Sequence, residues 1–314
     1  MNVYPEWFIG SCYFIFGLIF GSFLNVCIYR LPRGLSVVAP RSACPGCSTP
    51  IAWHDNIPVL SWLALRGRCR QCRQPITPRY ALVELVCGLL FLLSFLRMES
   101  PVDAVKSCVI CFLLLGLTFT DAETHLLPDA MTLPGLFVAV VFSLFSLVPG
   151  PAFLYPIHVH GAPSAWDANL QLALRSLANS LLGAAAGAGI LWGIGWVYQK
   201  LRDVEGMGLG DVKLMAMVGA FLGPVLTIFA LCLASIAGGV FGCWVLLAVY
   251  VKRLKRYRPR LGRAAATRAA RAAQTTLRAL EIPFGVFLCM VSLIAWFYGP
   301  SMIRAYLHWM NFLR

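Results

Sequence analysis

Eight apolar segments set the strongest constraint on how this chain can fold. They lie near residues 7–29, 80–97, 104–121, 131–149, 176–198, 212–227, 228–250 and 282–300. About 20 mainly apolar residues are enough for a helix to cross the ~30 Å hydrocarbon core of a bilayer. The chain is 59% hydrophobic and 12% charged, and this composition excludes an ordinary soluble globular protein. The sequence therefore predicts an all-α polytopic membrane protein with about eight transmembrane helices.

The distribution of Lys and Arg predicts which loops face the cytoplasm. Of the 26 such residues, 21 fall in the loops 28–79, 121–130, 199–213 and 251–281. Because basic residues concentrate in cytoplasmic loops, we expect these loops inside and both termini in the periplasm of a bacterial inner membrane. The net charge of +13 is accounted for by residues that flank the spans and contact anionic membrane lipids, so no nucleic acid is expected as a partner.

These features divide the chain into five expected parts. They are a first transmembrane helix (residues 1–30), a cytoplasmic zinc-binding loop domain (31–79), a transmembrane core (80–250), a basic cytoplasmic insertion (251–281), and a last transmembrane helix with a periplasmic tail (282–314). The insertion is rich in Ala and Arg, which favours a helix lying on the lipid surface over a flexible charged linker. The outer segment from Pro149 to Ala168 holds several prolines and predicts an irregular loop.

Two C-x2-C pairs in the loop 31–79 predict the zinc site. The pairs are Cys44 with Cys47 and Cys69 with Cys72. Four thiolates complete a tetrahedral shell around one zinc ion, and the reducing cytoplasm disfavours disulfides between them. Iron is the main competing ion for four sulfur ligands. Because no coordination position stays open, we expect the metal to support folding and not catalysis.

Asp121 and Asp211 are the candidate catalytic residues. Asp211 follows Gly208 and Gly210 at the start of one apolar segment, whereas Asp121 ends another. An ionisable side chain at membrane depth is costly, which favours a functional role. Both acids lie at the predicted cytoplasmic border, where two carboxylates can share a proton, one acting as base toward water and the other as acid. Ion pairing or helix capping is the structural alternative for either residue.

Several elements of the sequence, taken in order, resemble one enzyme family. They are Gly21 to Pro32, the two C-x2-C pairs, Arg79 to Leu85, Asp121 to Asp129, Gly206 to Lys213, and Ile282 to Gly285. Together they resemble the bacterial type IV prepilin peptidases over nearly the whole chain. The G-x-G-D element by itself is shared with archaeal preflagellin peptidases and presenilin-like intramembrane proteases, so it indicates only the wider class.

The resemblance implies a bifunctional enzyme. Its peptidase activity would remove a basic leader from type IV prepilins or type II secretion pseudopilins at the cytoplasmic membrane face, with Asp121 and Asp211 as the catalytic pair. Its second activity would methylate the new N-terminal residue from S-adenosylmethionine. The sequence has no Gly-rich nucleotide fingerprint, so we expect the donor in a pocket that abuts the membrane and borders the zinc loop. A non-catalytic assembly factor of a pilus or secretion system is the alternative, and an ion transporter is a third.

Weaker candidates for positioning the substrate are Gly208, Gly210, Asn25 and Glu84. Glycines let a peptide backbone approach closely. Asn25, inside the first span, needs a hydrogen-bond partner that a substrate backbone could supply.

Polar residues near the spans also have structural interpretations. For Glu84 we favour an ion pair with Arg79 or Arg30 over contact with substrate or methyl donor. Asp129 precedes an apolar stretch and is favoured as a helix N-cap. Lys213 is interpreted as a side chain that extends toward the membrane surface.

Overall fold

Helices account for almost all regular structure in this protein. The structure, a computed structural model, describes residues 5–145, 165–203, 208–261, 265–279 and 283–312. Within these ranges the β-structure amounts to isolated bridges. Among the described residues, six helices are long and apolar enough to cross a membrane, and the apolar helix α5 is shorter. The expected all-α polytopic class is therefore confirmed.

The described chain contains nine helices, in the following order. They are α1 (Glu6–Arg30), α2 (Leu60–Ala64), α3 (Arg79–Arg97), α4 (Pro101–Thr124), α5 (Asp129–Phe145), α6 (Ala165–Arg202), α7 (Leu209–Leu261), α8 (Ala265–Ala279) and α9 (Phe284–Phe312), with 3-10 turns at Leu31–Arg33 and Trp53–Asn56. Most of the expected irregular loop between Pro149 and Ala168 lies outside the described residues.

Helix α7 covers two of the expected spans because it turns back at Gly223. The backbone of Gly223 is non-helical, with a φ of 75°, a conformation that glycine adopts without the steric cost of a Cβ atom. Met215 and Thr227 both lie against Gly187 of α6, although a straight helix would hold them roughly 18 Å apart. The two halves of α7 therefore form a hairpin, which agrees with the expected segments 212–227 and 228–250.

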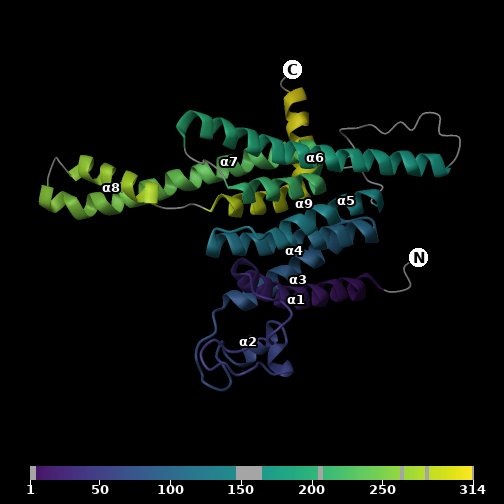
Figure 1. Ribbon diagram of the computed structural model, residues 1–314, viewed down its shortest axis with the longest axis horizontal. Coiled ribbons are helices and arrows are strands. Elements are labelled where there is room, and N and C mark those ends of the chain that lie inside the picture. Colours follow the sequence, from purple (N-terminus) through teal and green to yellow (C-terminus); the bar gives the residue numbers. More distant parts are fainter. Residues whose placement is uncertain (1–4, 146–164, 204–207, 262–264, 280–282, 313–314) are drawn as a thin grey trace.

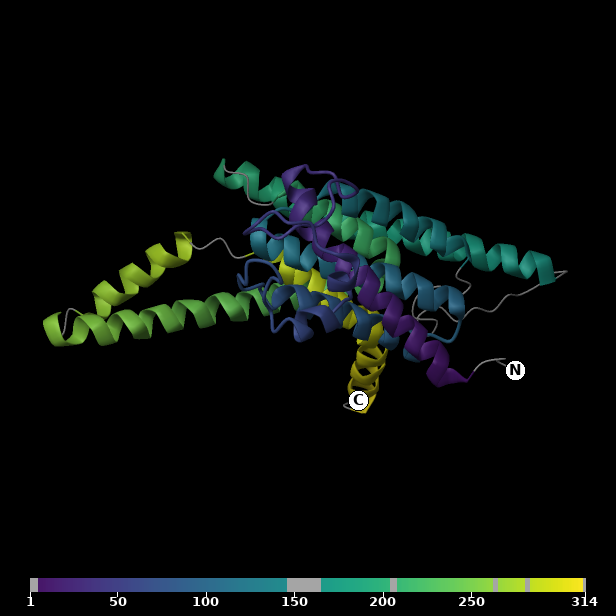
Figure 2. The same cartoon turned by 90° about the horizontal axis from the view of Figure 1, so that it is seen from below.

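The helices are stacked in layers across the molecule. Figures 1 and 2 show α1 and α3 at one side, α4 beside them, α5 and α9 next, and α6 with the first half of α7 at the opposite side. The loop that contains α2 lies against the α1 and α3 side, at one end of the bundle (Figure 1). This stacking brings the end of α4 close to the starts of α7 and α9.

Glycines let neighbouring helices approach closely at two places. A Cβ atom on Gly17 of α1 would lie 2.7 Å from the Cα of Gly88 on α3, and Gly183 of α6 directly contacts Gly219 of α7. Small residues at helix interfaces are typical of membrane proteins, since lipid tails provide no hydrophobic drive for association and close backbone packing has to replace it.

The described part of the basic stretch 251–281 is helical, as expected, and it forms a hairpin, while its position on the lipid surface stays a prediction. Helix α7 continues to Leu261, and α8 packs back against it. Figure 1 shows the pair projecting beyond the bundle along the direction of the spans. This pairing leaves Ala269 fully buried while Arg268 and Arg271 are exposed. Ala269 of α8 therefore packs on a helix of the same chain.

Candidate functional site

Asp121 and Asp211 meet beside the first turn of α9. Asp121 belongs to the last turn of α4, and Asp211 belongs to the first turn of α7. A methyl group added to Gly285 of α9 would lie 2.8 Å from Asp121 Oδ2 and 3.4 Å from Asp211 Oδ1. Three helix ends thus bring two carboxylates from distant parts of the sequence to one position.

The Asp121 carboxylate is held by the N-terminus of α9. Asp121 is only 5% exposed, and its Oδ2 atom accepts a hydrogen bond of 2.9 Å from the backbone N–H of Val286. The first N–H groups of a helix have no partner within the helix, and the helix dipole there favours negative charge. In the described part of the chain, Asp211 accepts no comparable backbone hydrogen bond. The two carboxylates therefore have unequal surroundings.

Local sequence sets the ends of the helices that carry both acids. His125 caps the C-terminus of helix α4. It adopts the left-handed conformation and donates its backbone N–H to the carbonyl of Asp121. The following Leu127 packs on Gly210, because a Cβ atom on that glycine would lie 3.3 Å from the Leu127 Cβ. By contrast, a Cβ atom on Gly208 would have only the backbone N of Gly210 within 4 Å, at 3.9 Å. Gly210 therefore allows the close approach of the two chain segments.

The four predicted zinc ligands lie together outside the spans. The sulfur atoms of Cys44, Cys47, Cys69 and Cys72 all lie within 4.8 Å of one another. The Sγ atoms of Cys44 and Cys72 are 3.7 Å apart, close to the edge of about 3.8 Å expected for a tetrahedron with Zn–S bonds of 2.3 Å. Hydrogen bonds with Thr49 lower the pKa of Cys47 to about 6. The donor set therefore fits a four-thiolate metal site.

The two cysteine pairs are built in the same way. A β-bridge joins Ala43 to Pro50 around the first pair, and another joins Arg68 to Pro75 around the second. In each pair the residue after the second cysteine, Ser48 or Arg73, has a positive φ. This turn directs both sulfur atoms of a pair to the same side, so that two such turns can enclose one ion.

Comparisons with known proteins bear directly on the family of this chain. Residues 15–98 match the bacterial Peptidase A24 N-terminal domain, and residues 108–243 match the type IV leader peptidase family. The prepilin leader peptidase/N-methyltransferase of Aeromonas hydrophila is 33% identical over 98% of this chain and 96% of the relative. The enzyme of the same name from Klebsiella pneumoniae is 41% identical over 68% of this chain and 85% of the relative.

The chain belongs to the type IV leader peptidase family. It is a multi-pass membrane protein of that family of aspartic peptidases. The first matched region covers α1, the cysteine loop and α3, whereas the second runs from α4 into the second half of α7. The hairpin of α7 and α8 extends beyond both regions. None of the solved structures matches this chain.

The remaining candidates of this leader peptidase, Asn25 and Glu84, form hydrogen bonds with the backbone of other segments. Asn25 is 4% exposed and donates a hydrogen bond of 3.0 Å to the carbonyl of Tyr80, so it joins α1 to α3. Its Oδ1 atom is buried without a partner in the described residues. Glu84 accepts a hydrogen bond of 2.7 Å from the backbone N–H of Val59. Val59 has a φ of 61°, which is unusual for a β-branched residue, so Glu84 holds the cysteine loop at a strained position.

The expected ion pair of Glu84 with Arg79 and the expected helix cap by Asp129 are wrong. Glu84 forms no ion pair with Arg79, which pairs with Glu123 and so links the start of α3 to the end of α4. Lys213 donates hydrogen bonds of 2.8 Å to both carboxylate oxygens of Asp129. Asp129 begins α5, but its carboxylate stabilises the approach of α5 to α7 in place of capping its own helix. Both pairings join residues that sequence periodicity cannot relate.

Sequence reasoning did not assign Gly285 and Val286 to the site. Their proximity to the carboxylates depends on how α9 packs between α4 and α7. The signal that was available is the segment Ile282 to Gly285, which carried part of the family resemblance. Glycine is required at position 285 because α9 approaches the Asp121 carboxylate closely, and a Cβ atom there would overlap it.

Proposed function

We propose that this protein cleaves the leader from type IV prepilins or type II secretion pseudopilins and then methylates the new N-terminus. The names of both relatives combine a prepilin leader peptidase with an N-methyltransferase, and the match to the Aeromonas hydrophila enzyme covers 98% of this chain. The observation that carries the peptidase assignment is the convergence of Asp121 and Asp211 at Gly285.

The unequal surroundings of the two acids suggest a role for each. Asp121, which accepts the Val286 N–H, is the member that keeps the negative charge and takes a proton from the attacking water. Asp211 holds the proton that is passed to the leaving amine. Two carboxylates that both lie beside Gly285 cannot both ionise readily, so the pair shares one proton. No covalent intermediate is needed.

The position of the pair suits a substrate that is anchored in the membrane. Both acids lie at helix ends, at the border that the Lys and Arg distribution assigns to the cytoplasm. A prepilin inserted by its hydrophobic segment would present its basic leader at this border. This orientation, with the protein in the bacterial inner membrane, both termini periplasmic and anionic lipids around the basic loops, forms part of the proposal.

Two further groups complete the proposed enzyme. The thiolates of Cys44, Cys47, Cys69 and Cys72 would hold a structural zinc ion, and the short distance between two of the sulfur atoms supports this assignment. The relatives' name implies a methyl donor. As that donor, S-adenosylmethionine would supply an electrophilic methyl group for the amine that leader removal exposes.

Replacing each aspartate tests the peptidase proposal. Asp121→Asn and Asp211→Asn keep the size of the side chain but prevent proton exchange, so each should lower the cleavage rate of a purified prepilin by about 10²- to 10⁴-fold. Gel separation of precursor and mature pilin measures the rate, and thermal unfolding confirms that the variants fold.

Asp129→Asn is the matched control, because Asp129 is also an acid near a helix start but pairs with Lys213. It should retain most of the activity. Cleavage at the normal rate by folded Asp211→Asn protein would rule out the aspartate-pair mechanism.

A further inference from the structure

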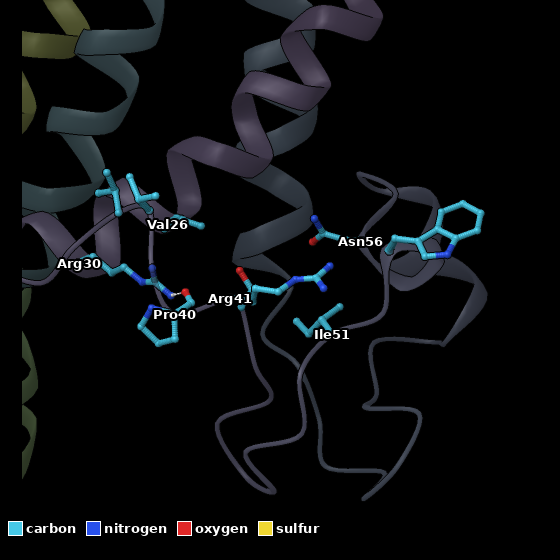
Figure 3. Close-up of a pocket in the computed structure, with 10 residues that line it drawn as sticks. Val26, Arg30, Pro40, Arg41, Ile51 and Asn56 are labelled. Atoms are coloured by element: carbon cyan, nitrogen blue, oxygen red, sulfur yellow. Dashed lines mark hydrogen bonds between the residues drawn. The ribbon is translucent and has the colours of Figure 1, made fainter.

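A cavity of about 290 Å³ lies between the last turns of α1 and the loop that carries the first cysteine pair. Figure 3 shows that Val26 and Arg30 of α1 line one side, and that Arg41, Ile51 and Asn56 of the loop line the other. The cavity approaches the lower limit of the size range of small-molecule sites. It is separate from the aspartate pair and from the cysteine cluster.

The charges of this cavity favour an anion. Two guanidinium groups line it, and none of its lining residues is acidic. Arg30 donates hydrogen bonds of 2.9 Å and 2.7 Å to the carbonyls of Ser36 and Pro40, so it shapes the wall while its charge stays uncompensated by a carboxylate. Arg41 is exposed and forms no ion pair within the described chain. Guanidinium groups bind phosphate oxygens by paired hydrogen bonds.

The depth of the cavity corresponds to the headgroup layer of a bilayer. Helix α1 has 25 residues and therefore spans roughly 37 Å, more than the ~30 Å hydrocarbon core. Its last turn carries Tyr29, half exposed beneath the guanidinium of Arg33 at 4.2 Å, and tyrosine is typical of the membrane surface. Exposed Phe16, Phe20 and Phe23 continue along α1 toward its other end, providing an apolar surface for acyl chains.

We propose that this cavity binds the phosphate of an anionic phospholipid, with Arg41 and Arg30 facing the headgroup and the acyl chains lying along α1. The bound lipid would fix the cysteine loop to the membrane surface, because Arg30 already ties α1 to the residues at Ser36 and Pro40. Basic pockets at this side of membrane helices are suited to lipid headgroups. The proposal concerns binding and does not depend on the peptidase assignment.

Lipid binding to Arg41→Gln protein tests this site. Purified protein is titrated with phosphatidylglycerol or phosphatidylcholine, and native mass spectrometry measures the bound lipid. We expect the wild type to prefer phosphatidylglycerol, and Arg41→Gln to lower the affinity for that lipid about fivefold, the effect of one basic residue at a membrane surface. Arg41→Lys keeps the charge and should retain most of the affinity.

Arg66→Gln provides the charge-matched control. Arg66 lies on the same loop, is exposed and does not line the cavity, so its loss changes the net charge equally but should leave the lipid affinity near that of the wild type. An equal loss in the Arg66 and Arg41 variants would show only general electrostatic attraction and would overturn the proposal. Displacement of the lipid by an equal concentration of glycerol phosphate would also overturn it, because the cavity would then take a soluble phosphate.

Discussion

Because Gly285 has no side chain, both carboxylates can lie beside the first turn of α9. Glycine is needed here for space and not for an unusual φ, since any Cβ atom would lie 2.8 Å from Asp121 Oδ2. The adjacent Val286 N–H then reaches the same carboxylate. One residue without a side chain therefore allows both the close approach of α9 and the hydrogen bond that distinguishes Asp121 from Asp211.

Gly285→Ala should lower the cleavage rate constant with little effect on stability. The added methyl group displaces the Asp121 carboxylate, and a misplacement of about 1 Å in an active site costs about 10²-fold in rate. Steady-state kinetics should show a lower kcat with a nearly unchanged KM, because prepilin docking does not involve this atom. Gly239→Ala is the control, since nothing lies within 4 Å of its added methyl group. Equal rates for the two variants would exclude a positioning role for Gly285.

At the scale of elements, the cysteine loop is held together by interactions that are not helical. Arg70 forms two hydrogen bonds with Asp55, of 2.8 Å and 2.6 Å, which join the second cysteine pair to the turn at Trp53–Asn56. The guanidinium of Arg70 lowers the pKa of Asp55, so this pair stays ionised at neutral pH. Glu84 adds the contact to Val59. With only the short helix α2, the loop has little apolar core of its own.

Metal removal should therefore unfold the loop and leave the helices folded. We expect about one zinc ion per chain by elemental analysis, because four thiolates complete one tetrahedral site. Chelation, or replacement of Cys44 and Cys47 by Ser, should release the ion and expose residues 31–78 to proteases, since metal binding supplies folding free energy.

Cys232→Ser serves as the control for metal release, because Cys232 is exposed in α7 and lies far along the chain from the metal cluster. This variant should keep its zinc. A metal-free protein whose loop resists proteases as well as the zinc-bound protein does would disprove a structural role for the metal.

Close packing between α6 and the first half of α7 leads to a prediction on stability. An added Cβ atom on Gly219 would collide with the backbone of Gly183, so Gly219→Ala should destabilise the protein by about 1–3 kcal/mol, the usual cost of overpacking. The decrease in Tm in detergent measures this effect. Gly189→Ala adds the same group to α6 where nothing lies within 4 Å and should not lower the Tm. A Tm for Gly219→Ala equal to that of Gly189→Ala would contradict the packing argument.

At the scale of the whole molecule, the aspartate pair and the cysteine loop occupy separate regions. The pair lies among the ends of α4, α7 and α9, whereas the loop packs at the side of α1 and α3 (Figure 1). The contact between Arg79 and Glu123 joins the two regions through the ends of α3 and α4. This separation suggests that the two proposed chemical steps use different groups.

Asp211→Asn protein should still transfer a methyl group when it is given a pilin that has already lost its leader. Methyl transfer requires the free amine and the donor, but it does not require paired carboxylates. Incorporation of labelled methyl from S-adenosylmethionine measures this activity, and intact precursor is the control, because the variant should leave it unmethylated. Normal binding of mature pilin and donor without methyl transfer would instead place the aspartates in both active centres.

Much of this architecture could be predicted from the sequence because it depends on local properties. The length and hydropathy of each apolar segment determine that it forms a helix suited to a bilayer, and the spacing of Cys44, Cys47, Cys69 and Cys72 predicts their common site. The position of Asp121 and Asp211 at the ends of apolar segments indicated that they could meet, and the structure brings them to one place.

Only the tertiary structure decided which partners these residues have. Sequence spacing cannot relate Glu84 to Val59, Lys213 to Asp129, or Val286 to Asp121, because each contact depends on how separate segments pack. The backbone conformation of Gly223 likewise fixes the residue at which α7 reverses, a position that hydropathy alone places only approximately. Apolar patterning determines that each helix forms and enters the membrane, whereas close contacts between side chains and backbones select one arrangement of the helices and with it the geometry of the site.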